Sequence, residues 1–134
     1  MNAADTNILL YARDPRDQNK EQTASGLIQT PPDPVLLWQV ACEYVAASRK
    51  LRSAGHGPDR AWDDVARLSK LRPLRLPSDR ILSEARLLNQ SRSLSVWDAL
   101  LIAACVEANV TTLFTEDLQH GAMLNGVEVV NPVV

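Results

Sequence analysis

An unbroken run of eight apolar residues, 99–106, constrains this chain more than any other stretch. The run is too long for a typical buried strand and lacks the alternation of an exposed one, so it predicts a helix that is buried on most sides. Asp98 stands at the head of this helix, where burying a carboxylate is costly unless a cation or hydrogen-bond donors meet it. Ser95 lies three residues earlier, and the simpler alternative is that Asp98 only completes a capping box.

A second carboxylate follows the predicted helix. Asn109 is a typical helix-ending residue, and residues 111–115 are rich in β-branched and aromatic side chains, which predicts a short strand. Residues 118–120, closed by Gly121, predict the start of another helix. Asp117 would then lie where a strand ends and a helix begins, which is the edge where open α/β sheets bind ligands.

The first residues of the chain predict a similar junction. A short strand is expected to end near Asp5, and Thr6 or Asn7 is expected to cap the helix that follows. Asp5 would then occupy the same kind of strand-to-helix junction as Asp117. The simpler alternative is that Asp5 is only an N-cap, which is a common position for aspartate.

A fourth acidic residue lies alone on an apolar helix. Residues 35–37 predict a strand, and residues 38–54 predict a helix that Gly55 ends. Glu43 is the only charged side chain in residues 35–48. Its neighbours on the helical wheel are mostly apolar or small: Gln39, Val40, Ala46 and Ala47. This setting suits a side chain that faces a crevice, whereas a lone glutamate on a helix is more often directed to solvent.

Helices and strands alternate along the whole chain. Further helices are expected at residues 18–29, 60–71 and 78–88. A further strand is expected at residues 127–130, and residues 73–76 are expected to be a brief strand or an extended link. This alternation favours a parallel sheet of four or five strands covered by helices on both faces, within a single domain at residues 1–134. The apolar positions of the two later helices are Trp62, Val65, Ala66, Leu68, Ile81, Leu82, Ala85, Leu87 and Leu88.

The cysteines and the apolar runs exclude several classes of protein. Cys42 and Cys105 are isolated within apolar helical patterns, and no Cys/His spacing resembles a zinc site, so both are expected to be buried thiols. No run is long enough for a membrane helix, and the N-terminus lacks the basic-then-apolar layout of a signal peptide. The expected location is the cytosol.

The net charge of −2 hides an uneven distribution. Residues 49–92 carry eleven basic and five acidic side chains, whereas both ends of the chain are acidic. Such charges often solvate the outer faces of helices, but a basic block is also typical of proteins that contact nucleic acid phosphates. The sequence leaves both interpretations open.

Four carboxylates, Asp5, Glu43, Asp98 and Asp117, would converge at the carboxyl edge of one sheet if their strands are neighbours. Grouped like charges repel and raise one another's pKa unless a cation lies among them. A ligand set made only of oxygen suits Mg²⁺ or Mn²⁺ and disfavours zinc. Because bound Mg²⁺ keeps open positions for phosphate oxygens, the matching chemistry is metal-assisted hydrolysis of a phosphodiester.

These motifs, in this order, resemble the PIN-domain family and specifically the small VapC-type toxin ribonucleases. The matching segments are DTNILLYA at Asp5, ACEYVAA around Glu43, SVWDALLIAAC around Asp98 and LFTEDLQHG around Asp117. The resemblance covers nearly the whole chain and implies a three-layer α/β/α fold with a central parallel sheet.

The resemblance also implies roles for individual residues. Asp5, Asp98 and Asp117 would bind Mg²⁺ or Mn²⁺ directly or through water, and Glu43, within the same acidic cluster, would position or deprotonate the attacking water. The expected supporting residues around these carboxylates are Thr6, Asn7, Thr115 and Glu116. Glu116 stands beside Asp117, so the identity of the fourth acid stays open, with Asp117 preferred for its N-cap-like position.

The resemblance further implies an RNA substrate, a homodimer and a small antitoxin protein that silences the toxin. The residues expected to contact RNA are Arg49, Lys50, Arg52 and Arg75. One alternative is a catalytically silent PIN fold that binds RNA or protein. Another is an unrelated phosphatase or phospho-acceptor domain using Asp5, which would need a lysine or a second aspartate close behind Asp5 that the sequence lacks.

Overall fold

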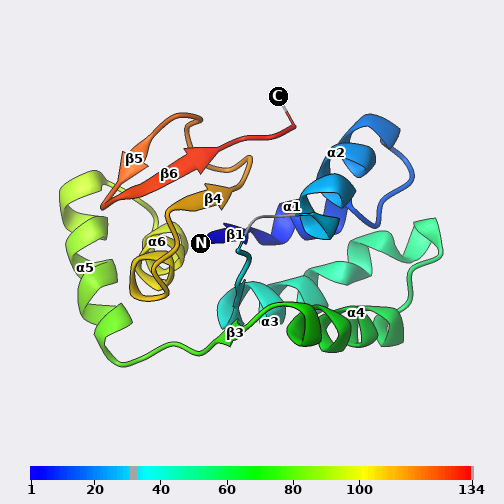
Figure 1. Cartoon of the computed structure of the whole chain (residues 1–134), viewed down its shortest axis with the longest axis horizontal. Helices are drawn as coiled ribbons and strands as arrows, with labels where there is room; N and C mark the ends of the chain where they lie inside the picture. The colour runs from blue at the N-terminus through cyan, green and yellow to red at the C-terminus, as the bar shows by residue number, and fades with distance from the viewer. Residues whose placement is uncertain (31–32, 134) are drawn as a thin grey trace.

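The central sheet contains four strands in the part of the chain described by the computed structural model, residues 1–30 and 33–133 (Figure 1). Their order across the sheet is β1 (Asn2–Ala4), β4 (Thr112–Phe114), β6 (Val127–Val130) and β5 (Met123–Leu124). β1 pairs with β4, and β4 with β6, in parallel. The carboxyl ends of β1 and β4 therefore lie side by side, and the predicted α/β fold with a parallel-dominated sheet is confirmed.

The outer strand β5 is antiparallel to β6 and was not predicted. The two strands are joined by Asn125 and Gly126, whose φ angles are 49° and 83°. Two successive positive φ angles define the turn that matches the twist of a two-residue hairpin, and Asn-Gly is the sequence that adopts it most readily. The signal for this hairpin was therefore present in the sequence.

The other edge of the sheet continues into two short strands, β2 (Leu36–Leu37) and β3 (Leu74–Arg75), which pair in parallel. Asn2 donates from its backbone N to Asp33 O at 3.0 Å, and Val35 N donates to Asn2 O at 2.9 Å. These bonds attach the segment before β2 to β1. The sequence also predicts a break in the chain at the proline-rich residues 30–34, of which residues 31 and 32 lie outside the described part of the chain.

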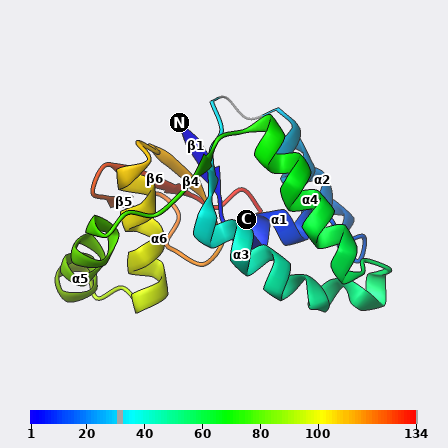
Figure 2. The ribbon, with the colours of Figure 1, turned by 90° about the horizontal axis from the view of Figure 1, so that it is seen from below.

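The helices form two groups with β1 between them, as Figures 1 and 2 show. The first group contains α1 (Thr6–Tyr11), α2 (Gln18–Gln29), α3 (Trp38–Ala47), the 3₁₀ helix η1 (Ser48–Ala54) and α4 (Pro58–Leu71). The second contains α5 (Arg80–Arg92) and α6 (Val96–Glu107). No helix in either group, within the described residues, is long and apolar enough to cross a membrane.

Helix α6 lies in the core, as the apolar run predicts. Ala99, Ile102 and Cys105 are fully buried, and α6 packs against both α5 and β6. Asn109 adopts a φ of 60° just beyond the helix end, which is the left-handed conformation that asparagine tolerates well. The buried position predicted for Cys105 is confirmed.

The inward face of α4 differs from the predicted one. The buried residues are Ala61, Asp64 and Leu68, whereas Trp62 and Ala66 are exposed. The buried stripe is rotated because Asp64, a charged residue, occupies an inward position among cationic and hydroxyl partners. An apolar pattern alone cannot indicate such a buried charge.

Two other helices bury a narrower face than their apolar residues suggest. In α5, Ile81, Ala85 and Leu88 are buried at helical spacing, while Leu82 and Leu87 lie on the exposed side. In α3 the inward residues are Val40, Ala41 and Tyr44. Cys42 points away from them and is exposed, so its prediction as a buried thiol is wrong.

One predicted helix ends earlier than expected, and another predicted helix does not form. The helix predicted for residues 38–54 stops at Ala47, and the tighter helix η1 continues to Gly55, whose φ of 84° ends it. No helix forms at residues 118–120, which are bends and turns. The backbone after these residues instead hydrogen-bonds to β6: Gly121 N donates to Val129 O at 2.8 Å, and Val129 N donates to Ala122 O at 2.9 Å.

Replacing Leu113 with Ala should lower the free energy of unfolding by about 2–5 kcal/mol, because it opens a cavity in the central strand. Leu113 is completely buried between β1 and β6. Urea denaturation measures the change, and Leu87→Ala, at an exposed position on α5, is the control, which should shift the value by about 0.5 kcal/mol or less. Equal effects of the two substitutions would contradict the assigned core.

Candidate active site

Asp5 lies at the junction that the sequence predicts, but it caps the helix itself. Its backbone N donates to Phe114 O at 2.8 Å, which continues the ladder between β1 and β4 by one residue. Its Oδ1 accepts from Thr6 N at 2.7 Å at the start of α1, a role expected for Thr6 or Asn7. This cap fixes a carboxylate, only 6% exposed, at the carboxyl end of the sheet.

Thr115 connects three elements around Asp5. Its buried Oγ1 donates to Asp5 Oδ2 at 2.8 Å and accepts from Asp117 N at 3.1 Å. The Asn7 side chain also donates to Thr115 Oγ1, at 3.4 Å. A hydroxyl has one hydrogen and two lone pairs, so this side chain uses its full bonding capacity. Thr115 therefore holds the Asp5 carboxylate, and Asn7 in turn holds Thr115.

Glu43 faces α1 rather than open solvent. Its Oε2 accepts from Thr6 Oγ1 at 3.2 Å, and its Oε1 accepts from Gln39 Nε2 at 3.0 Å. Gln39 lies one turn earlier on α3 and was identified from the sequence only as a neighbour on the helical wheel. Because Thr6 also donates its backbone N to Asp5, one residue contacts both carboxylates.

Asp98 occupies the first turn of α6, and its backbone N donates to Ser95 Oγ at 3.1 Å, so Ser95 is the N-cap of this helix. Its side chain is partly buried. The spacing of seven residues places Asp98 on the same face of α6 as Cys105. Burial and the nearby charge of Asp5 raise the pKa of the Cys105 thiol to about 12, so Cys105, about 10 Å along the helix from Asp98, lies near Asp5.

The two acidic residues after β4 point in different directions. Glu116 accepts a hydrogen bond from the Tyr11 hydroxyl and pairs with Lys20 Nζ at 3.7 Å. Asp117 is exposed, and its charge acts on Asp5. Glu116 is therefore engaged by α1 and α2, whereas Asp117 lies near enough to Asp5 for its charge to act on that carboxylate. The N-cap-like position expected for Asp117 is absent because no helix follows it in the described chain.

Burial raises the pKa of Asp5 to about 6, and the charges of Asp117 and Glu43 add to the increase. The hydrogen bonds from Thr115 and Thr6 oppose it. A carboxylate in this setting is destabilised in its charged form, and a nearby cation would reverse that effect. The electrostatics of the site therefore favour a bound cation.

The residues fit a hard divalent cation by their chemistry. All four acids supply oxygen, and the Asn7 Oδ1 atom is buried without a hydrogen-bond partner. Within residues 1–30 and 33–133, no three His, Cys, Asp or Glu side chains are grouped closely enough to hold a metal ion together. One or two carboxylates would be enough for Mg²⁺, which usually keeps several of its waters.

The basic residues expected to contact RNA do not form one patch. Arg49, Lys50 and Arg52 are exposed on η1, which precedes α4. Arg75 is exposed on β3, which follows α4. The fourteen residues of α4 separate the two positions, corresponding to about 21 Å of helix.

The raised pKa of Asp5 predicts a pH-dependent stability. The unfolded carboxyl titrates near 3.8 and the folded one near 6. Between these values the folded protein binds more protons, so the free energy of unfolding should fall as the pH rises from about 4 to about 6, by at most about 3 kcal/mol. In metal-free buffer, Asp5→Asn should remove this fall, as urea unfolding at both pH values would measure. An identical pH dependence in both proteins would contradict the assignment.

A family model of the PIN domain matches residues 3–123. No curated protein matches the chain. The fold is similar to that of a chain in a toxin–antitoxin complex from Klebsiella pneumoniae, with a TM-score of 0.70, 21% identity and 98% of each chain covered.

Two further structures share the fold. VapC20 from Mycobacterium tuberculosis, described as a toxin that cleaves the sarcin-ricin loop, has a TM-score of 0.65 and 22% identity over 87% of this chain and 92% of its own. FitAcB from Neisseria gonorrhoeae has a TM-score of 0.65 and 18% identity over 98% of each chain. With the motif order, the strand order and the family match in agreement, this chain belongs to the PIN domain family.

Proposed function

We propose that this protein is a divalent-metal-dependent endoribonuclease and the toxin of a toxin–antitoxin pair. The observation that carries the proposal is the buried carboxylate of Asp5, held at the carboxyl end of β1, with its pKa raised by burial, by Asp117 and by Glu43. Membership of the PIN domain family and the similarity to toxin chains support it.

Asp5, Asp98 and Asp117 would hold Mg²⁺ or Mn²⁺, directly or through water. The bound metal supplies a lowered pKa for an attacking water and offsets negative charge on the phosphate oxygens. Glu43 is positioned by Thr6 and Gln39, one at each carboxylate oxygen, which leaves lone pairs free to accept a proton from that water. Thr115 holds Asp5 in orientation.

The proposed partners rest on the similar solved structures and on the basic residues exposed on this chain. One of the similar structures is a toxin–antitoxin complex, which supports an antitoxin as partner of this chain. The exposed basic residues Arg49, Lys50, Arg52 and Arg75 are the proposed contacts to RNA phosphates. Their separation by the length of α4 would let one RNA contact the protein at two distant points.

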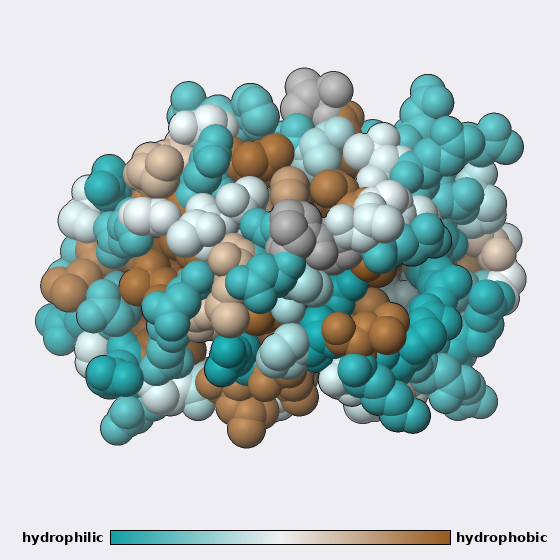
Figure 3. Space-filling view, in the orientation of Figure 1, coloured by the Kyte–Doolittle hydropathy of each residue, from teal (hydrophilic) through white to brown (hydrophobic). Residues whose placement is uncertain are grey.

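A second copy of this chain is the proposed partner of an exposed apolar face. Trp38, Leu76, Leu82 and Trp97 are exposed around a groove of about 550 Å³ between the start of α3, the link after β3 and the helices α5 and α6. Figure 3 shows hydrophobic side chains gathered at the lower edge, where the link between β3 and α5 runs in Figure 1. A contiguous apolar surface of this kind is typical of an interface.

A second candidate function is a PIN fold that binds RNA or a protein without cleaving RNA. It is favoured by one observation: among the described residues, no three acidic, His or Cys side chains are grouped closely enough to hold a metal ion. RNA binding without cleavage at any Mg²⁺ or Mn²⁺ concentration would favour this candidate.

Cleavage of total RNA by purified, partner-free protein tests the proposed function. Asp5→Asn and Asp98→Asn should each lower the cleavage rate roughly 100-fold or more, because each removes a charge that faces the metal. EDTA should abolish cleavage. Asp63→Asn, the same change at an exposed position on α4, is the matched control. Metal-dependent cleavage that persists in Asp98→Asn would remove Asp98 from the mechanism.

The dimer has its own test, sedimentation velocity of partner-free protein. Leu82→Asp should convert a dimer into a monomer, because it places a charge in the apolar face. Trp62→Asp is the control, since Trp62 is equally exposed but lies on α4. A monomeric wild-type protein, or a dimer insensitive to Leu82→Asp, would refute this interface.

A further inference from the structure

Asp117 lies in irregular backbone, because residues 116–118 are bends, and its side chain is exposed. Thr115 Oγ1 accepts from Asp117 N at 3.1 Å on one side, and Leu118 packs against the core on the other. An exposed residue in irregular backbone opens more easily than a residue in a packed helix. The position of the Asp117 carboxylate therefore depends on how firmly its neighbours are held.

Glu116, the residue just before Asp117, is held at both carboxylate oxygens. Its Oε1 accepts from the Tyr11 hydroxyl, and its Oε2 lies 3.7 Å from Lys20 Nζ. Lys20 Nζ also donates to the Tyr11 hydroxyl at 3.2 Å and lies 4.6 Å from the centre of the Tyr11 ring. Tyr11, Lys20 and Glu116 thus form a closed group, the Glu116 clamp, in which each side chain contacts the other two.

The hydrogen bond from Tyr11 is the stronger of the two contacts to Glu116. The side chains of Lys20 and Glu116 are 33% and 28% exposed, so solvent screens the ion pair between them. A hydrogen bond to a charged acceptor is about twice as strong as one between neutral groups. We therefore expect the loss of the Tyr11 hydroxyl to loosen Glu116.

Helix α1 connects the clamp to the acidic site. Tyr11 follows Asn7 by four residues, so both side chains lie on one face of α1. Asn7 donates to Thr115 Oγ1, and Tyr11 donates to Glu116. One face of α1 therefore holds two consecutive residues of the chain immediately before Asp117.

The clamp also adds no net charge beside the acids. The pKa of Tyr11 is raised by burial and by its hydrogen bond to Glu116, so the hydroxyl keeps its proton at neutral pH. The ammonium of Lys20 offsets the carboxylate of Glu116. To bind a metal ion, Glu116 would have to give up both partners, which is costly for a partly buried carboxylate. Asp117, by contrast, acts on Asp5.

We propose that Glu116 is a positioning residue, held by Tyr11 and Lys20, which fixes the backbone so that Asp117 stays beside the other acids and can bind the metal ion. Glu116 is not itself a metal ligand. The proposal deepens the proposed function, and rests on it in so far as Asp117 binds a metal ion. The fixing of the backbone requires neither metal nor RNA.

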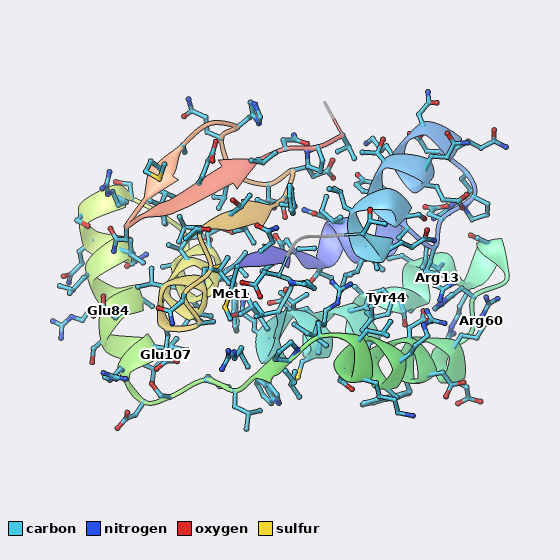
Figure 4. All side chains as sticks on the ribbon, in the orientation of Figure 1. Met1, Arg13, Tyr44, Arg60, Glu84 and Glu107 are labelled. Atoms are coloured by element: carbon cyan, nitrogen blue, oxygen red, sulfur yellow. The ribbon has the colours of Figure 1, made fainter. Side chains whose placement is uncertain are left out.

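The test compares the partner-free wild type with four variants. Tyr11→Phe removes the hydroxyl and keeps the ring, and Glu116→Ala removes the clamped side chain. Glu116→Gln removes the charge but keeps an oxygen that can accept from Tyr11, so it is the conservative variant. Glu84→Ala is the matched control, because Glu84 is exposed on α5, far from α1 and α2 (Figure 4). Urea unfolding checks that each variant folds.

Amide hydrogen exchange in EDTA measures how firmly residues 115–121 are held. Tyr11→Phe and Glu116→Ala should each speed exchange of this segment about three- to tenfold, because a hydrogen bond that opposes opening is lost. Glu116→Gln and Glu84→Ala should stay within about twofold of the wild type. If Glu116→Ala fails to fold, Tyr11→Phe decides the outcome.

Mn²⁺ binding, followed by the electron paramagnetic resonance signal of the free ion, measures the effect on the metal site. Tyr11→Phe and Glu116→Ala should each weaken binding about tenfold, as expected when support for a ligand is lost. Glu116→Gln should bind nearly as tightly as the wild type. A metal-binding Glu116 would give a different pattern: Glu116→Gln would be as weak as Glu116→Ala, and Tyr11→Phe would bind no more weakly than the wild type.

Wild-type exchange in Tyr11→Phe, or equal losses of Mn²⁺ binding in Glu116→Gln and Glu116→Ala, would overturn the proposal. A wild type that binds no Mn²⁺ would overturn it together with the proposed metal site. If the expected pattern of exchange and Mn²⁺ binding is found but the wild type cleaves no RNA, the role of Glu116 is supported and the proposed nuclease fails.

Discussion

The hydrogen bond from Thr115 Oγ1 to Asp5 Oδ2 is the contact on which the site depends. It joins the ends of β1 and β4, two strands separated by more than a hundred residues of sequence. The same hydroxyl accepts from Asp117, so the chain on both sides of the acidic site is fixed through one buried side chain. The bond holds the Asp5 carboxylate where its charged form is costly. It therefore bears on the stability of the fold and on the proposed function.

Much of this arrangement follows from the sequence because the relevant signals are local. Three elements have a clear pattern in the sequence, and the structure contains them as predicted: the apolar helix α6, the helix α2 and the strand β6. Asp5 and Asp117 follow strands that pair side by side, so their proximity follows from the parallel topology. For Glu43, its isolation on an apolar helix was the indication that it faces a crevice, and its bond to Thr6 agrees with that.

The errors arise where tertiary contacts override a local pattern. The inward position of Asp64 depends on partners from three other segments, Arg13, Tyr44 and His56, so no property of α4 alone could reveal it. The absence of a helix after Asp117 depends on the edge of β6, which holds the backbone in a different path. The Glu116 side chain is likewise held by Tyr11 and Lys20, which lie far from it in the sequence.

The two cysteines have very different surroundings, so their reactivity with alkylating reagents should differ and can report on opening of the core. Cys105 is fully buried beneath the acidic site with a pKa of about 12, while Cys42 is exposed on α3. Alkylating reagents attack the thiolate, so Cys42 reacts in the folded protein and Cys105 only after the core opens. In a variant that lacks the Cys42 thiol, the labelling rate of Cys105 would report directly how often the core around α6 opens.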